Sequence, residues 1–281
     1  MNAYTISLEM LLGFERWLAC SEHSPATREK YLREARWFAA WLNTLPLEKN
    51  QLIAWRDTLV GKGYTVATIN GKMAAIHALL YYLGRKDCRV RPLKMQRRLF
   101  REPGRELTRG EYFRLLSAAR DSGRLRLLLI MEVLGSTGIR ISELCFITRE
   151  AIDRGQTTVR CKGKLRTILL PRKLCRRLRR YAVERGITAG PIFRTKGGKP
   201  VDRSNVWKEL KALARRAGVE GRRVFPHNFR HLFARRFYAL EKDLGKLADV
   251  LGHSSISTTR IYLMESGRAH ERLLNQMKML L

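Results

Sequence analysis

The chain has 281 residues, and its 56 lysines and arginines outnumber its 25 aspartates and glutamates, which gives a net charge of +31 spread from end to end. That length suffices for two domains, and so large a positive charge is typical of proteins that bind a nucleic acid backbone. No apolar run approaches the roughly 20 residues that span a bilayer, and the five cysteines lack zinc-site or disulfide spacing, so we expect a cytoplasmic protein with no membrane partner.

Four amphipathic helices are predicted between residues 5 and 84. The second begins with Ser24 as its N-cap and Pro25 behind it, and the fourth opens near Thr65 and ends at Gly84. Tryptophans on these helices could stack on bases, but in a helical bundle of this size they are more often core residues. We therefore expect four of them in the core: Trp17, Trp37, Trp41 and Trp55.

The periodicity fades over residues 85–106, where arginine and lysine are frequent. We predict a basic linker there, between a first domain at 1–84 and a second domain at 107–281. The linker is either a solvated loop or a cationic tether, and a tether between two basic domains suits a clamp around a duplex. Thr108 can cap the next helix, with Glu111 reaching back from the third helical position as a capping box.

An apolar helix at 125–134 leads into the string Thr-Gly-Ile-Arg-Ile-Ser-Glu-Leu, in which apolar residues flank Arg140 and Glu143. An arginine drawn toward a core in this way needs an anion. The anion is either Glu143, in a structural ion pair, or a substrate phosphate. Without further information the residues favour the ion pair.

A β-hairpin follows, because the period changes to that of strands. Residues 157–161 and 165–170 are the predicted strands, and Lys162 and Lys164 lie at the tip between them. Lysines at such a tip are usually solvated. Three further elements are predicted after the hairpin: a basic helix at 171–181, a short strand at 191–194 and a helix from Asp202 or Ser204 to Ala217.

The segment 225–262 concentrates side chains that chemistry on a phosphodiester would need. Pro226 suits the first position of a helix, where its missing N–H costs nothing. Three residues of that helix, at i, i+3 and i+4, share one face: His227, Arg230 and His231. A lone histidine on a helix is more often structural, so the case for function rests on the joint pattern.

A second helix in this segment ends at Gly252, which places His253 just past a helix end. Ser257 or Thr258 can cap a further short helix that carries Tyr262, nine residues after His253. The segment thus offers imidazoles, a guanidinium and a phenol.

Taken together, these motifs resemble the tyrosine recombinase family, which includes phage integrases and Xer recombinases. The motifs are Thr-Gly-Ile-Arg-Ile-Ser-Glu-Leu, His-x-x-Arg, Leu-Gly-His and the tyrosine nine residues after that histidine. The resemblance covers the catalytic domain well and the N-terminal domain in outline. It implies a mainly α fold with a small β-sheet, in which a helical, SAM-like core-binding domain at 1–84 and a catalytic domain at 107–281 form a clamp around DNA.

The resemblance also implies a function. The chain would be a site-specific DNA recombinase that cleaves and rejoins strands through a 3′-phosphotyrosine, acting as a homotetramer on double-stranded DNA with specific recombination sites. The apolar helix predicted at 268–281 is the candidate for contacts between protomers. We expect no arm-binding domain, which favours an Xer-like or invertase-like architecture, although integrases of mobile elements share this size.

Six catalytic roles are implied, with one supporting role. The guanidiniums of Arg140 and Arg230 would stabilise the pentacoordinate phosphorus, with Glu143 orienting Arg140 and His253 as a further hydrogen-bond donor. Tyr262 would be the nucleophile and Lys162 the general acid, while His227 would assist proton transfer or buttress the site. Lys164 is the alternative to Lys162, because the hairpin departs from the common Gly-Lys-Gly form. No cofactor and no metal is expected, since the sequence has no nucleotide-binding glycine loop and no acidic cluster.

Two other functions fit the same sequence. A type IB topoisomerase shares similar active-site chemistry and would relax supercoils without exchanging partners. A DNA-binding protein that has lost catalysis would keep the fold, but all six catalytic positions are filled. The target site, the direction of reaction and the need for accessory proteins are not encoded in any pattern of this kind.

Overall fold

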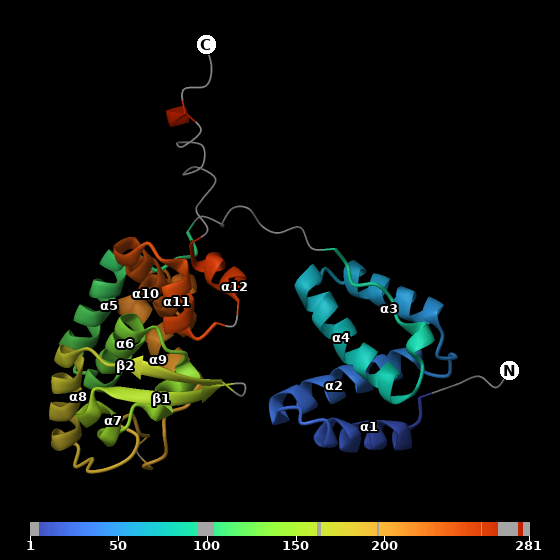
Figure 1. The fold of residues 1–281 in the computed structure, drawn as a ribbon, viewed down its shortest axis with the longest axis horizontal. Coiled ribbons are helices and arrows are strands. Elements are labelled where there is room, and N and C mark those ends of the chain that lie inside the picture. The colour runs from blue at the N-terminus through green and yellow to red at the C-terminus, as the bar shows by residue number, and fades with distance from the viewer. Residues whose placement is uncertain are drawn as a thin grey trace. The chain divides into compact units, whose positions relative to one another are not determined.

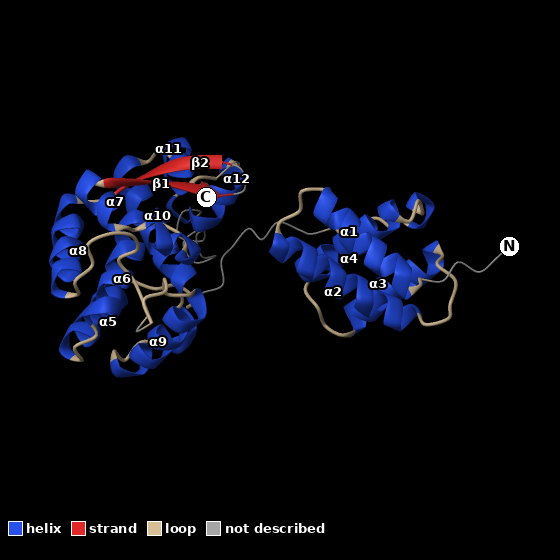
Figure 2. Cartoon of the chain, turned by 90° about the horizontal axis from the view of Figure 1, so that it is seen from below, coloured by secondary structure: helices blue, strands red, loops and turns tan. Residues whose placement is uncertain are grey.

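The chain divides into two compact units, Met1–Arg97 and Arg98–Leu281, in the computed structural model (Figure 1). The structure describes residues 6–94, 104–161, 164–195, 197–253, 255–263 and 275–277. Over these ranges the regular structure is helical except for a two-stranded sheet in the second unit (Figure 2). No helix in the same ranges has the length and apolar character needed to cross a membrane. The predicted mainly α fold with a small sheet is confirmed.

The first unit contains the four helices that the sequence predicts. They are α1 (Leu8–Cys20), α2 (Pro25–Leu42), α3 (Lys49–Gly61) and α4 (Val66–Tyr82). The Ser24 side chain accepts a hydrogen bond from the Thr27 amide at the start of α2, with Pro25 in the first turn, and Thr65 caps α4 in the same way. Each cap pairs an amide that the helix itself leaves without a partner, which fixes where the helix begins.

The tryptophans of the first unit belong to its core, as predicted. Trp55 is 1% exposed, and the rings of Trp37 and Trp41 lie against it with centroid distances of 4.6 and 5.2 Å. Trp17 packs against Tyr82 in a second cluster, to which α1 and α4 contribute, and the two ring centroids are 6.1 Å apart. Three of these rings thus form one aromatic cluster between α2 and α3.

The first unit extends further than the helices alone indicate. A 3₁₀ turn at Lys86–Cys88 follows α4, and Cys88 and Val90 are buried in the core. The Asn70 side chain exchanges two hydrogen bonds, each of 2.9 Å, with the backbone of Leu93. The first part of the predicted linker, 85–94, therefore packs on the first unit, and 95–103 lies outside the described residues. At the other end of the linker, Arg105 and Glu106 contact the second unit through Asn228 and Arg235. The linker prediction was wrong at its start because these contacts are tertiary and leave no helical period.

The helices of the second unit surround an apolar central helix. In chain order they are α5 (Arg109–Asp121), α6 (Leu125–Thr137), α7 (Arg149–Arg154), α8 (Arg172–Glu184), α9 (Arg203–Arg216), α10 (Pro226–Glu241), α11 (Leu244–Leu251) and α12 (Ile256–Arg260). Helix α6 is buried along most of its length and contacts α5, α8, α9 and α10, because a helix that is apolar nearly all round must be covered on several sides. Thr108 and Glu111 form the predicted capping box of α5.

Two helix starts in the second unit are set by their capping side chains. Asp202 caps α9, which selects the first of the two predicted starts. The side chain of Ser255 caps α12 by accepting a hydrogen bond from the amide of Ser257. The predicted cap at Ser257 or Thr258 is therefore wrong, because all three hydroxyl residues suit a cap locally and only the path of the chain after α11 selects one.

The hairpin pairs β1 (Gln156–Cys161) with β2 (Lys164–Leu169) in antiparallel register, with Val159 opposite Arg166. Ile168 and Val159 are buried on one face, while Leu165 and Leu169 are exposed on the other. Because side chains alternate along a strand, Arg166 lies on the face that points toward the core.

The further strand predicted at 191–194 does not form as an element. Pro191 and Arg194 make only isolated bridges, to Thr148 and Pro200. The prediction was wrong because Ile192 and Phe193 are apolar as part of the core of the second unit, while in the part of the chain that the structure describes their backbone makes only single hydrogen bonds, with Ile147 and Val201, and no ladder. The apolar helix predicted at 268–281 lies outside the described residues except for 275–277.

Candidate active site

Arg230 lies at the centre of the predicted site, where α10 buries it to 1% exposure. Four of its five N–H groups have partners. Nη1 donates to the carbonyl of Gly138 (2.6 Å), Nη2 to the carbonyl of Leu251 (2.7 Å) and to Nε2 of His253 (2.9 Å), and Nε to the hydroxyl of Tyr262 (3.3 Å). The planar guanidinium therefore joins α6, α10 and α11 to the segment that carries the tyrosine.

Close packing at the end of α6 makes the first of these contacts possible. Gly138 ends the helix with φ of +64°, and a Cβ atom there would lie 2.3 Å from the ring of Phe233. Only glycine fits both this backbone conformation and this approach. The carbonyl of Gly138 is thereby aimed at Arg230, and the chain turns directly into Arg140.

His253 has a defined tautomer in this arrangement. Its Nε2 atom must accept from Arg230, since a guanidinium has no lone pair to offer, and its Nδ1 atom therefore carries the proton and donates to Oγ1 of Thr259 (2.8 Å). Desolvation, with the positive charges of Arg230 and Arg140, lowers the pKa of His253 to about 4. The imidazole is therefore neutral at neutral pH.

Tyr262 lies in the short 3₁₀ turn Ile261–Leu263 after α12 and is only 4% exposed. Histidine rings surround its phenol. The ring of His253 stacks on it at 5.5 Å with an interplanar angle of 11°, and the ring of His227 lies at 5.8 Å. His227 as a residue is exposed to solvent. Partial desolvation of its ring and the positive charges of Arg230 and Arg140 lower the pKa of His227.

His231 is a site residue to which the sequence assigned no role. Its ring is 4.4 Å from the ring of Tyr262 and 4.6 Å from that of His227, and the residue is 9% exposed. Desolvation, with the charges of His227 and Arg230, lowers the pKa of His231 to about 4. Its position on the same helical face as His227 and Arg230 was the available signal. Among the described residues, no group of three or more histidine, cysteine or acidic side chains could hold a metal ion.

Arg140 forms the predicted ion pair with Glu143, and it also keeps unused donors. Oε1 of Glu143 accepts from Nη1 of Arg140 (3.0 Å), while Oε2 accepts from the Arg140 backbone amide (2.7 Å). The Arg140 side chain is 35% exposed, and its Nε and Nη2 atoms have no hydrogen-bond acceptor within the described ranges. The two partners that the sequence suggests for Arg140, Glu143 and a substrate phosphate, are therefore compatible. One guanidinium can pair with Glu143 and still offer donors to a phosphate.

Arg166 is a second residue that the sequence did not single out for the site. It reaches from β2 to the same carboxylate, with Nη2 donating to Oε2 of Glu143 (2.5 Å), and its Nη1 donates to the carbonyl of Val250 (2.9 Å). Its side chain is 10% exposed. The hairpin is therefore fastened to both Glu143 and the end of α11.

The structure describes the backbone of only one of the two candidate lysines. Lys162, the predicted general acid, lies outside the described residues, together with Gly163. Lys164 is the first residue of β2 and pairs with Cys161. The lysine assignment therefore stays a prediction.

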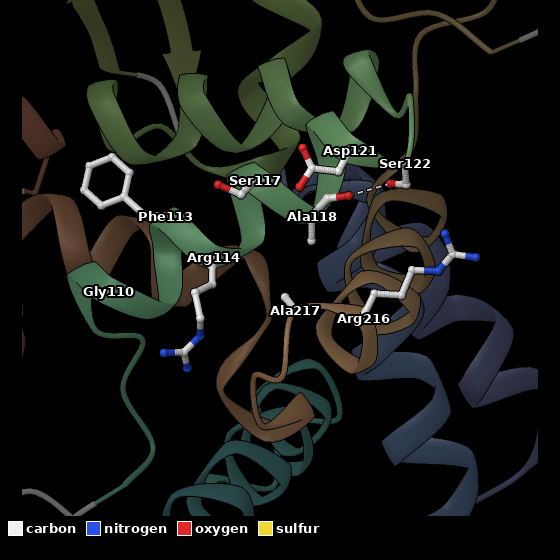
Figure 3. Close-up of a pocket in the computed structure, with 9 residues that line it drawn as sticks. All are labelled: Gly110, Phe113, Arg114, Ser117, Ala118, Asp121, Ser122, Arg216 and Ala217. Atoms are coloured by element: carbon white, nitrogen blue, oxygen red, sulfur yellow. Dashed lines mark hydrogen bonds between the residues drawn. The ribbon is translucent and has the colours of Figure 1, made fainter.

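A shallow hollow elsewhere in the second unit contains none of these residues. It lies between α5 and the C-terminal end of α9, has a volume of about 620 Å³, and is lined by residues such as Phe113, Arg114 and Arg216 (Figure 3). The candidate chemistry is thus not in this hollow but around Arg230 and Tyr262.

Comparison with known protein sequences identifies the family. Residues 105–267 match the model of the phage integrase family. Tyrosine recombinase XerA of Thermococcus kodakarensis is 32% identical over 263 residues, which cover 90% of each chain. Tyrosine recombinase XerC of Herpetosiphon aurantiacus is 30% identical over 241 residues, 79% of this chain and 76% of the relative.

Solved structures share the fold at lower identity. A lambda integrase (75–356) dimer bound to a COC′ core site has a TM-score of 0.73 and 20% identity, covering 94% of this chain and 97% of that one. The Tn1549 transposon integrase in complex with transposon right end DNA has a TM-score of 0.71 and 20% identity, covering 95% and 99%. Because the family model matches more than half of the chain and XerA of Thermococcus kodakarensis aligns over 90% of both chains, the chain belongs to the phage integrase family and is a site-specific recombinase of the tyrosine type.

Proposed function

We propose that this recombinase cleaves and rejoins DNA with Tyr262 as the nucleophile. The phenol oxygen attacks the scissile phosphorus, the bond from phosphorus to the 5′-oxygen breaks, and the strand is held as a 3′-phosphotyrosine that a 5′-hydroxyl can later attack in reverse. The observation that carries this proposal is the hydrogen bond from Nε of Arg230 to the Tyr262 hydroxyl. It places the phenol of the same chain beside a charged group suited to phosphate.

Arg140 and Arg230 have different roles in this proposal. Arg140 is partly exposed and has unused donors on one edge, so it forms paired hydrogen bonds to the non-bridging oxygens. Arg230 is almost fully committed to protein partners, so it mainly orients Tyr262 and adds its remaining N–H and its charge to the pentacoordinate state. Glu143 holds Arg140 at both its amide and its side chain.

His253 requires a change of state to act as a donor to the phosphate. Its Nε2 atom accepts from Arg230 here, so it offers that atom's lone pair and not a proton. The negative charge of a bound phosphodiester would favour the imidazolium, in which both ring nitrogens donate. We assign His253 the role of a donor that forms when DNA binds, with Thr259 holding the other nitrogen.

Proton transfer completes the proposed reaction. Lys162 donates a proton to the leaving 5′-oxygen, with Lys164 as the alternative donor on the same hairpin, and His227 assists the transfer of the phenol proton. The phenol proton leaves as the new bond forms, and the lysine proton arrives as the old bond breaks. No metal or cofactor enters these steps.

The partner proposed for this reaction is double-stranded DNA with specific recombination sites. A net charge of +31 favours binding to the phosphate backbone, and solved relatives include XerH bound to its difH substrate and a lambda integrase tetramer bound to a Holliday junction. We propose the same kind of assembly here, a tetramer on DNA in the cytoplasm, with the helical first unit as the core-binding domain.

Suicide substrates test the proposal. Purified protein is incubated with labelled, nicked duplexes that carry candidate sites, and covalent complexes are resolved on denaturing gels. Wild type and Tyr238→Phe, a matched change of a partly buried tyrosine on α10, are expected to give a covalent band that Tyr262→Phe lacks. The absence of any band on a tightly bound site would favour a non-catalytic DNA-binding protein. Relaxation of plasmids without strand exchange between two duplexes would favour a topoisomerase.

A further inference from the structure

Arg166 occupies an unusual position among the arginines of the second unit. It lies on the inner face of β2 opposite the buried Val159, and its side chain is 10% exposed. Its two terminal nitrogens reach two different parts of the site, the carboxylate of Glu143 and the last turn of α11. The partners are 23 and 84 residues away in the sequence, so the contacts are purely tertiary.

The contact with α11 bears on the orientation of His253. The carbonyl of Val250 accepts from Arg166, and Gly252 then ends the helix with φ of +66°. A Cβ atom on Gly252 would lie 2.5 Å from Cδ of Arg166, so the arginine side chain lies directly on this turn. The turn from which the His253 ring projects is therefore packed against β2.

The contact with Glu143 bears on the orientation of Arg140. Oε2 of Glu143 accepts from both the Arg140 amide and Arg166, while Oε1 accepts from Nη1 of Arg140. One buried carboxylate thus links the hairpin to the arginine proposed to bind the scissile phosphate. Because Glu143 is 3% exposed, water does not replace either partner easily.

The Nε atom of Arg166 is buried and has no hydrogen-bond partner among the described residues. A buried donor without an acceptor costs free energy of folding, and Nε of Arg235 is in the same state. The hydrogen bonds to Glu143 and Val250 hold the side chain in this position although Nε is left without an acceptor. The connection between β2, Glu143 and α11 is therefore made by the two terminal nitrogens and not by Nε.

We infer that Arg166 is a positioning residue that fastens the β1–β2 hairpin to Arg140 and to the Gly252 turn, so that the lysine at the hairpin tip reaches the same phosphate that Arg140 binds. The inference rests on the proposed function for its chemical consequence, since it assumes a lysine that protonates the leaving 5′-oxygen. It concerns the coupling of the hairpin to the rest of the site, and Arg166 itself touches no reacting atom.

A change of leaving group tests this coupling. Cleavage is measured on two suicide duplexes, one with the ordinary phosphodiester and one with sulfur in place of the scissile 5′-oxygen. A thiolate, whose parent thiol has a pKa of about 8.5, leaves without a proton, whereas an alkoxide, whose parent alcohol is a far weaker acid, needs one. The cleavage rate of the sulfur substrate divided by that of the ordinary phosphodiester is therefore low when the lysine delivers its proton well and rises when it does not.

The matched control is Arg126, which donates to the carbonyl of Arg194 (2.9 Å) and to the carboxylate of Glu209 (2.6 Å) in the same unit. It has the same pair of acceptor types as Arg166 but none of the site residues as partners. Arg166→Met and Arg126→Met are compared, with Arg166→Lys as the milder variant if the methionine variant does not fold. Thermal unfolding and DNA binding are measured for each.

The expected result is a selective defect. Arg166→Met slows cleavage of the phosphodiester by about a hundredfold and that of the sulfur substrate by less than about tenfold, so the ratio rises as it does for Lys162→Ala. Arg126→Met leaves the ratio at the wild-type value. Equal slowing of both substrates by Arg166→Met would overturn the inference, because it would mean that only the general integrity of the site is lost.

Amide hydrogen exchange keeps the inference testable independently of cleavage. Peptides covering β1 and β2 are expected to exchange faster in Arg166→Met than in wild type or Arg126→Met. Unchanged exchange would show that Arg166 does not hold the hairpin. If wild type forms no covalent complex with DNA, the proposed function fails while the exchange measurement still decides the structural claim. If neither Lys162→Ala nor Lys164→Ala is rescued by sulfur, the lysine assignment fails and the inference falls with it.

Discussion

The guanidinium of Arg230 donates from Nε to the hydroxyl of Tyr262 across 3.3 Å, with both side chains buried, to 1% and 4% exposure. The other contacts of Arg230 hold two backbone carbonyls and one imidazole, so the direction of this hydrogen bond is fixed by the fold. The tyrosine oxygen is therefore placed by the most constrained side chain of the site. Arg140, by contrast, is held on one edge only.

This difference predicts that the two arginines respond differently to substitution. Arg230→Lys removes the planar set of donors and leaves the carbonyls of Gly138 and Leu251 without full pairing, so we expect the free energy of unfolding to fall by about 2–3 kcal/mol and cleavage to fall at least about a hundredfold. Arg140→Lys should lose cleavage to a similar extent but only about 1 kcal/mol of stability. Urea denaturation and suicide cleavage measure the two effects.

The tautomer of His253 gives a second prediction. Thr259→Val preserves shape but removes the acceptor for Nδ1–H, which favours the tautomer whose Nε2–H would oppose Arg230. We expect DNA binding to be unchanged and cleavage to fall about tenfold, a barrier increase of about 1.4 kcal/mol. Thr258→Val, at the exposed neighbouring position, is the control and should cleave like wild type. Equal activity of both variants would show that Thr259 does not orient the ring.

The lowered pKa values of His231 and His253 predict that acid destabilises the protein. The pKa of His231 is lowered from 6.5 to about 4 in the folded state. Between these values the unfolded chain binds a proton that the folded chain does not, so the free energy of unfolding falls as pH drops from about 6.5 to 4, by up to about 3 kcal/mol for this group. His253 adds to the fall in the same window.

Chemical denaturation at pH 7.5, 6 and 5 measures this dependence. His231→Phe keeps an aromatic ring beside Tyr262 and cannot bind a proton, so its stability should change less over this range than that of wild type. Identical pH profiles for wild type and His231→Phe would contradict the assigned protonation state.

A pair of glycines separates backbone strain from crowding. Gly138 and Gly218 both have positive φ, +64° and +60°, but a Cβ atom on Gly138 would meet the ring of Phe233 at 2.3 Å, whereas one on Gly218 would meet nothing within 4 Å. Both alanine variants should lose about 1–2 kcal/mol to the backbone conformation, and Gly138→Ala should lose about 2 kcal/mol more to overpacking. Thermal unfolding compares the two. Equal losses would show that Phe233 moves aside freely.

Local signals in the sequence predicted most of the fold. Caps, apolar spacing and the change of period are set by residues within one or two turns of each other, so they located the four helices of the first unit, the Thr108–Glu111 capping box and the hairpin. They were wrong where tertiary contact decides. The stretch 85–94 packs on the first unit through Cys88 and Val90, and 191–194 makes only isolated bridges.

The sequence by itself determined which chemical groups are present: a phenol, two guanidiniums, histidines and hairpin lysines in an order that resembles one enzyme family. Only the tertiary structure decided how the groups are used. It joined Arg230 to Gly138, 92 residues away, brought Arg166 to Glu143 and Val250, and placed His231 against Tyr262. The physical reason is that each donor pairs with the acceptor that the folded chain brings near it. Spacing along the sequence does not record which acceptor that is.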